Sequence, residues 1–109
     1  MEDCVFCKII KNEIKVDFIY EDSDCVVFNS NAPVAEHHLL VVPKSHISNF
    51  MELDDKILPM TKVAQKVIRD KNILTGYKLI FNDGKYQEIP HLHWHILAGR
   101  LGDDILSKT

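Results

Sequence analysis

Residues 91–100, "HLHWHILAGR", place three histidines at alternate positions with bulky apolar residues between them. Because successive side chains on a β-strand point to opposite faces, this spacing predicts a strand over 91–99 with His91, His93 and His95 on one face. The apolar residues between them would pack in a core on the other face. Three imidazoles in a core would each need a hydrogen-bond partner, so the histidine face is predicted to be a polar site and not core. Such a site binds a metal through H-x-H or uses a histidine nucleophile that its neighbours orient.

The rest of the sequence predicts two helices and four further strands from its apolar periodicity and its turn residues. These are a short helix within 4–13, strands at 18–21 and 25–28 joined by a turn at 22–24, a strand at 38–43, a long helix within 52–72 and a strand at 76–83. Asp54 or Asp55 is expected to cap the long helix, and Pro59, placed past its first turn, predicts a late start or a bend. This order of elements is typical of an α+β domain with a mostly antiparallel sheet.

Length and charge narrow the class of protein. A chain of 109 residues is long enough for one compact domain, so we expect a single domain over 1–109. The formal net charge of −3 provides no basic surface for nucleic acid or an anionic membrane. No apolar run approaches the roughly 18 residues of a membrane span, and residues 1–10 lack the pattern of a signal peptide. We therefore expect a cytoplasmic protein that binds neither nucleic acid nor membranes.

The cysteines suggest a metal rather than disulfides, which are rare in the cytoplasm. Cys4 and Cys7 form a C-x-x-C pair, which is a good half-site for zinc if two more soft or borderline ligands complete it. The alternative is a pair of core thiols beside Phe6. Cys25 lies in the apolar run "CVVF" and is expected to be an inert buried thiol.

Four segments of the sequence resemble the histidine triad superfamily. "HLHWHIL" matches its signature of three alternating histidines, and "CVFCKIIKNEI", "HHLLVVPKSHIS" and "IFND" agree with it in order and spacing. Up to about Arg100, the chain is similar to the small branch called histidine triad nucleotide-binding proteins or protein kinase C inhibitor-like proteins. The resemblance implies a five-stranded, mostly antiparallel sheet with one long helix and a short N-terminal helix. It also implies a homodimer whose two sheets join into one of ten strands.

The resemblance implies a purine nucleotide-binding hydrolase that cleaves nucleoside phosphoramidates or related adenylates through a nucleotidyl-histidine. His93 resembles the nucleophile, whose imidazole is neutral and nucleophilic near pH 7. His95 and His38 resemble the histidines that donate to phosphate oxygens or assist proton transfer. The nucleotide-binding residues implied are Asn82 at the phosphate and sugar, Gln87 near the leaving group or phosphate, Phe6, Ile9 and Phe28 around the purine, and Ser30 near the ribose. Each of the three apolar residues could equally be plain core.

The resemblance also implies a structural zinc ion held by Cys4, Cys7, His46 and His91. His91 would then take no part in the reaction, although its backbone could still help to orient His93.

Several positions depart from the family pattern. Ser30 stands where the family usually has a ribose-binding aspartate, and Glu88 stands where serine is common. A carboxylate near phosphate would repel it unless the carboxylate is protonated or paired. The loop before the histidines is shorter than usual, and the tail "LGDDILSKT" lacks the family's tryptophan-containing ending, so specificity could differ.

Three other functions stay open on the sequence. One is hydrolysis of dinucleoside polyphosphates, the activity of the fragile-histidine-triad branch. Another is a nucleotide-sensing or interaction module with little catalysis, suggested by the altered ribose loop. The third is a zinc hydrolase that uses the H-x-H-x-H face for catalysis. Nucleotidyl transfer is less favoured, since that branch usually ends its triad with glutamine and this chain has His95.

Overall fold

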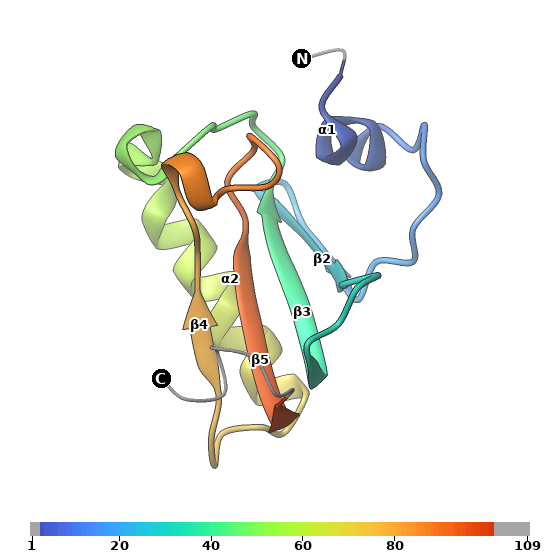
Figure 1. The fold of residues 1–109 in the computed structure, drawn as a ribbon, viewed down its shortest axis with the longest axis vertical. Coiled ribbons are helices and arrows are strands. Elements are labelled where there is room, and N and C mark those ends of the chain that lie inside the picture. Colours follow the sequence, from blue (N-terminus) through green and yellow to red (C-terminus); the bar gives the residue numbers. More distant parts are fainter. Residues whose placement is uncertain (1–2, 102–109) are drawn as a thin grey trace.

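The computed structural model describes residues 3–101, which form a five-stranded sheet with a helix on each side. The elements in chain order are α1 (Val5–Ile10), β1 (Tyr20–Glu21), β2 (Cys25–Asn29), β3 (Ala35–Pro43), α2 (Ile57–Asp70), β4 (Lys78–Ile80) and β5 (Trp94–Leu101), with 3-10 helices at Phe50–Glu52, Asp54–Lys56 and Gly84–Tyr86. The strand order is β1-β2-β3-β5-β4, and all neighbouring strands are antiparallel (Figure 1). The α+β fold with one long and one short helix is therefore confirmed. None of the helices described is long and apolar enough to cross a membrane.

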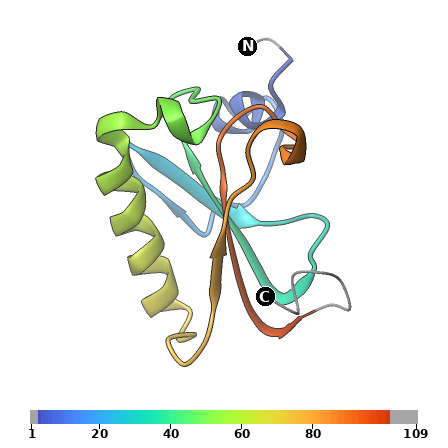
Figure 2. The same cartoon turned by 60° about the vertical axis from the view of Figure 1, so that its left-hand side comes forward.

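The long helix α2 lies along one face of the sheet (Figure 2). It buries its apolar face at helical spacing, through Met60, Val63, Ala64, Val67 and Ile68. Leu92, Trp94 and Ile96 belong to the same buried cluster. The residues between the histidines therefore pack in the core, as their alternation predicts.

The start of α2 differs from the prediction. Asp54–Lys56 already turn as a 3-10 helix that runs directly into Ile57, so the capping position falls on Lys56 and has no side-chain hydrogen bond. The prediction of an aspartate cap was wrong for this reason. Pro59 is the third residue of the helix and lies inside its first turn, where a missing N–H breaks no intrahelical bond.

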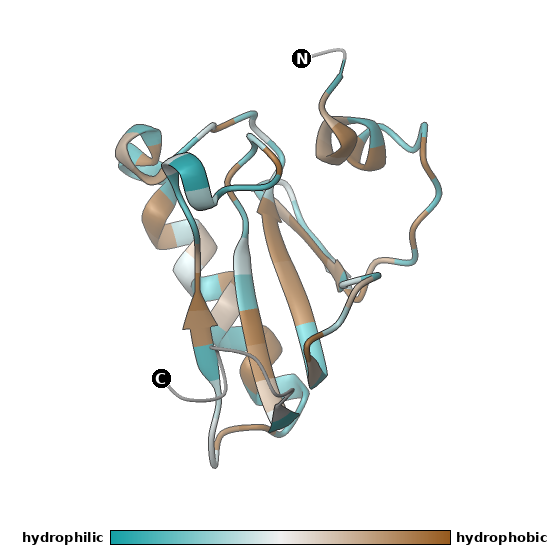
Figure 3. Ribbon diagram, in the orientation of Figure 1, coloured by the Kyte–Doolittle hydropathy of each residue, from teal (hydrophilic) through white to brown (hydrophobic). Residues whose placement is uncertain are grey.

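The opposite face of the sheet carries a second buried cluster beneath α1. Its members are Cys4, Phe6, Cys7, Ile9, Val26, Phe28, Leu40 and Val42. Because both faces of β3 are covered, this strand is hydrophobic along most of its length (Figure 3). The prediction that the histidine face holds no core was wrong: His91 is 0% exposed and His93 is 8% exposed. Each ring has a hydrogen-bond partner, which makes its burial tolerable.

The histidine strand is shorter than its sequence pattern suggests, because β5 begins at Trp94 and not at His91. Trp94 pairs with Val41, so a continued ladder would set Leu92 opposite Pro43. Proline has no N–H to donate to the Leu92 carbonyl. The Leu92 N–H is also directed away from the ladder, because it donates to the Ile47 carbonyl at 2.6 Å. The segment stays extended enough to keep the histidines on one side, but only His95 belongs to the ladder.

Candidate functional site

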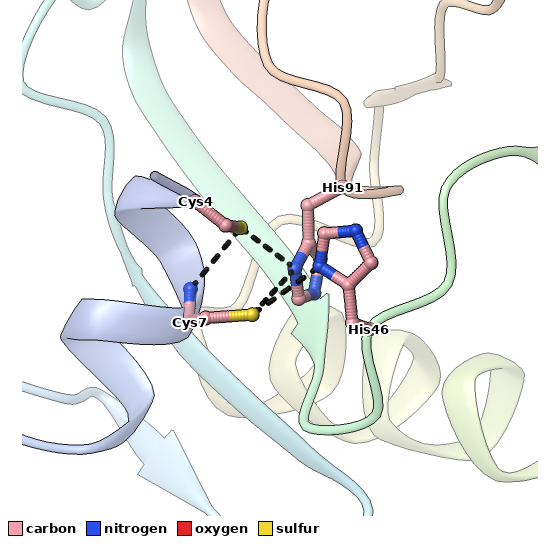
Figure 4. A group of neighbouring side chains, drawn as sticks. All are labelled: Cys4, Cys7, His46 and His91. Atoms are coloured by element: carbon pink, nitrogen blue, oxygen red, sulfur yellow. Dashed lines mark hydrogen bonds between the residues drawn. The ribbon is translucent and has the colours of Figure 1, made fainter. Parts of the chain in front are cut away.

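Two cysteines and two histidines meet beneath α1. The ligand atoms of Cys4, Cys7, His46 and His91 all lie within 4.8 Å of one another (Figure 4). His91 Nδ1 is 3.3 Å from Cys4 Sγ and 3.6 Å from Cys7 Sγ, and His46 Nδ1 is 3.2 Å from Cys7 Sγ. The Cys7 backbone N–H donates to Cys4 Sγ at the start of α1. The first turn of the helix therefore directs both sulfurs toward the imidazoles (Figure 4). These four residues are close enough to hold a metal ion.

The chemistry of the four donors fits a metal. The second ring nitrogen of His91, Nε2, donates to the Pro43 carbonyl at 2.9 Å, which leaves the Nδ1 lone pair directed at the sulfurs. Burial lowers the pKa of His91 to about 4, so the imidazole is neutral, as a ligand must be. Burial, followed by the hydrogen bond and charge of Cys4, raises the pKa of the Cys7 thiol. Two thiolates this close together and this buried would need a cation between them, because the raised pKa otherwise favours the protonated thiol.

Beside this cluster a cleft of about 570 Å³ opens on the same side of the sheet. Nearly all residues expected to bind the nucleotide or react with it line this cleft: Phe6, Ile9, Phe28, Ser30, His38, Asn82, His93 and His95. Much of the lining is apolar. The rings of His38 and His93 each lie close to the ring of His95, with centroids 5.1 Å and 4.9 Å apart. Phe6 joins the two sites, because its ring packs edge-on against His93 at 4.9 Å and against His91 at 5.8 Å between centroids.

The hydrogen bonds of His38 and His95 fix where their protons lie. The Val34 backbone N–H donates to His38 Nδ1 at 3.1 Å, so the proton of the neutral His38 ring is on Nε2. His38 Nε2 is 2.8 Å from His95 Nδ1, which must then accept. The proton of neutral His95 is therefore on Nε2. Burial, with the neighbouring His93 and His38, lowers the pKa of His95 to about 4, which keeps the ring neutral near pH 7.

His93 is held in the opposite tautomer. Its Nδ1 is 2.8 Å from the His91 carbonyl oxygen and must donate to it, so Nε2 keeps a free lone pair. Burial lowers the pKa of His93, while the bond to His91 and the charge of Glu88 oppose this effect. The site thus presents one unprotonated imidazole nitrogen on His93 and one N–H on His95.

Gln87 is not among the residues that line the cleft. Its side-chain amide donates to the Ser48 carbonyl at 2.7 Å. The next two residues, Glu88 and Ile89, line the cleft instead. Sequence reasoning also missed seven apolar lining residues, Val5, Val16, Ala32, Val34, Leu40, Ile80 and Ile89. Leu40 and Ile80 both lie opposite His95, on the two strands that flank β5.

Comparisons with known proteins agree with this architecture. Residues 11–102 match the family model described as the HIT domain. The chain is 40% identical over 105 residues to an uncharacterized HIT-like protein of Synechococcus elongatus, covering 91% of this chain and 92% of that protein. A histidine triad protein from Clostridium difficile superposes with a TM-score of 0.86 at 39% identity, covering 95% and 96% of the two chains. A HIT family hydrolase from Clostridium thermocellum gives a TM-score of 0.85 at 39% identity, covering 96% and 98%.

Proposed function

Because this chain belongs to the HIT domain family, we propose that it is a purine nucleotide-binding hydrolase that cleaves nucleoside phosphoramidates or related adenylates. The observation that carries the proposal is the pair of opposed tautomers at the cleft. His93 offers a nitrogen lone pair and His95 offers an N–H. A nucleophile beside a fixed donor is the arrangement that attack on phosphorus requires.

Different residues of the cleft suit the purine, the ribose and the phosphate of a nucleotide. Phe6, Ile9 and Phe28 supply an apolar wall for the purine. Ser30 lines the cleft and is assigned to the ribose, although its hydroxyl already accepts from the Ala32 N–H at 3.2 Å. Asn82 lines the cleft together with the histidines and supplies an amide for the phosphate. Gln87 contacts the leaving group only if the substrate replaces the Ser48 carbonyl as its hydrogen-bond acceptor.

The reaction proceeds in two displacements at phosphorus. His93 Nε2 attacks the α-phosphorus, the P–N bond breaks, and the departing amine takes up one proton from solvent. The His95 N–H donates to a phosphate oxygen and stabilises its charge, with His38 holding His95 in the required tautomer. Water then attacks the nucleotidyl-histidine, releases the nucleoside monophosphate and restores the free nitrogen. One water is consumed, and a P–N bond is exchanged for a P–O bond.

We further propose that Cys4, Cys7, His46 and His91 hold a structural zinc ion. Two sulfur and two nitrogen donors are a common zinc set, and four protein ligands leave no open position for a substrate. His93 and His95 lie outside the four-residue cluster, which argues against catalytic zinc. All three cysteines are free thiols, which suits the reducing cytoplasm expected for this protein.

A homodimer through β4 completes the proposal. β4 is an edge strand of the sheet, and Tyr77, Leu79 and Phe81 along it are each more than a third exposed. An exposed apolar edge is a template for pairing with another strand. Two copies paired symmetrically at β4 would form one ten-stranded sheet.

The decisive experiment removes the nucleophile. His93→Ala should abolish turnover of an adenosine phosphoramidate, by at least about a thousandfold, while circular dichroism and zinc content stay as in the parent. Parent protein quenched in alkaline denaturant, in which a phosphorus–imidazole bond survives, should carry one nucleotide mass on His93. Full turnover by the variant would refute the mechanism. Nucleotide affinity without turnover or adduct in the parent would favour a sensing module.

A further inference from the structure

The charge on the cleft is unusual for a site that receives a phosphate. Among the described residues that line it, Glu88 is the only one with a formal charge, and there is no lysine or arginine. His38 and His95 do not compensate, because burial lowers the pKa of both rings, that of His95 to about 4. The cleft therefore carries a net negative charge.

The Glu88 carboxylate has no partner within the part of the chain that is described. It forms no hydrogen bond or ion pair there, yet its charge acts on His93. An unpaired carboxylate beside a phosphate site weakens the binding of every anionic ligand, unless the ligand itself carries a positive charge to it.

The backbone holds Glu88 in place from both sides. Gln87 is anchored by its side-chain bond to Ser48 and by a backbone bond to Gly84, at 3.0 Å. Ile89 packs against the cluster beneath α1, and its carbonyl accepts from the His91 N–H at 2.8 Å. The backbone at Glu88 is thus held in register with the histidines, and its side chain extends from this fixed point into the lining of the cleft.

From this arrangement we propose that Glu88 selects the leaving group by its charge. It favours an amine that carries a second, positive group, and it disfavours an anionic leaving group such as the phosphate chain of a dinucleoside polyphosphate. The inference rests on the proposed hydrolysis of phosphoramidates, and it assigns a specificity role to a residue that does not itself react. Single exposed charge pairs contribute modestly, so the expected preference is about threefold for each unit of charge.

The test uses three adenosine 5′-phosphoramidates with leaving amines of similar length: pentylamine, 1,4-diaminobutane and 4-aminobutanoate. Their distal ends are neutral, cationic and anionic. The kcat/KM of the parent protein should rank them cationic, neutral, anionic. Glu88→Gln should bring the three values to within experimental error of one another, and Glu88→Lys should reverse the order. Glu13→Gln removes the same charge from an exposed glutamate outside the cleft and should keep the parent ranking.

The outcomes separate this inference from the function on which it rests. Turnover with identical ratios in the parent and Glu88→Gln would overturn the inference and leave the hydrolase intact. If the parent protein hydrolyses none of the three compounds, they stay intact during a binding measurement. The ratios of their dissociation constants then replace the ratios of kcat/KM. A charge ranking lost in Glu88→Gln would then support Glu88 as the selecting residue although the hydrolase had failed. Raising the salt concentration should compress the ranking, since an exposed charge is screened.

Discussion

Replacing His95 with glutamine should remove a defined part of the pH dependence of stability. Burial lowers the pKa of His95 from 6.5 to about 4. The folded protein therefore resists protonation there, and the unfolded chain binds more protons between these two pH values. The free energy of unfolding must fall as the pH falls from about 6.5 toward about 4. Glutamine does not titrate, yet it can still accept from His38 and donate to a phosphate.

The size of the effect follows from the two pKa values. At about 1.4 kcal/mol per pKa unit, the fall from 6.5 to about 4 sets an upper limit of ~3.4 kcal/mol. His95 is only half-buried, so solvent screening reduces this figure. Between about pH 7 and pH 5 the parent should lose roughly 1–2 kcal/mol more stability than the variant.

Urea unfolding at several pH values, with zinc held constant, measures the difference between the two proteins. Protonation of the metal ligands and of the other histidines occurs in both proteins and largely cancels in the subtraction. If the two stability curves run parallel from pH 7 to pH 5, His95 is not a desolvated neutral imidazole. The chain of tautomers from His38 through His95 would then be wrong.

Three further perturbations test other parts of the structure. Cys7→Ser, or removal of metal by a chelator, should lower the melting temperature and weaken AMP binding together, because α1 and its capping residue carry the two sulfur donors and part of the cleft wall. Calorimetry in which only the stability changes would contradict this link. Leu79→Lys, on the exposed edge of β4, should halve the mass measured by light scattering without altering the helical signal, and an unchanged mass would remove β4 from the interface. Gly99→Ala should lower the free energy of unfolding by about 1–3 kcal/mol in chemical denaturation. Gly99 has a φ of +76°, and a Cβ there would lie 2.5 Å from the Glu36 carboxylate. An unchanged free energy of unfolding would mean that Glu36 moves aside freely.

The local pattern of the sequence determined the elements and their faces. Alternation at 91–96 predicted that Leu92, Trp94 and Ile96 pack in the core, and they do. The helical spacing of α2 likewise predicted its buried face. Such patterns are local, because the side-chain period of a strand or helix is set within a few residues.

The limits of two elements differ from what the sequence pattern predicts. The sequence pattern extends the histidine strand to His91, but Pro43 on the facing strand cannot continue the ladder, so β5 starts at Trp94. Asp54 looks like a helix cap, but a 3-10 turn moves the boundary to Lys56. The first limit depends on a strand that is distant in the sequence, whereas the second is set by hydrogen bonds within residues 53–57.

What the sequence by itself determined was that imidazoles would gather on one side of a sheet and two thiols on one helical turn. From residue types alone, it left open which histidine served which purpose. Only the tertiary structure brought Cys4 to His91, 87 residues away, and His38 to His95, 57 residues away. The tautomers of His38, His95 and His93 follow from a backbone N–H at Val34 and a carbonyl at His91, and such contacts exist only once the chain is folded.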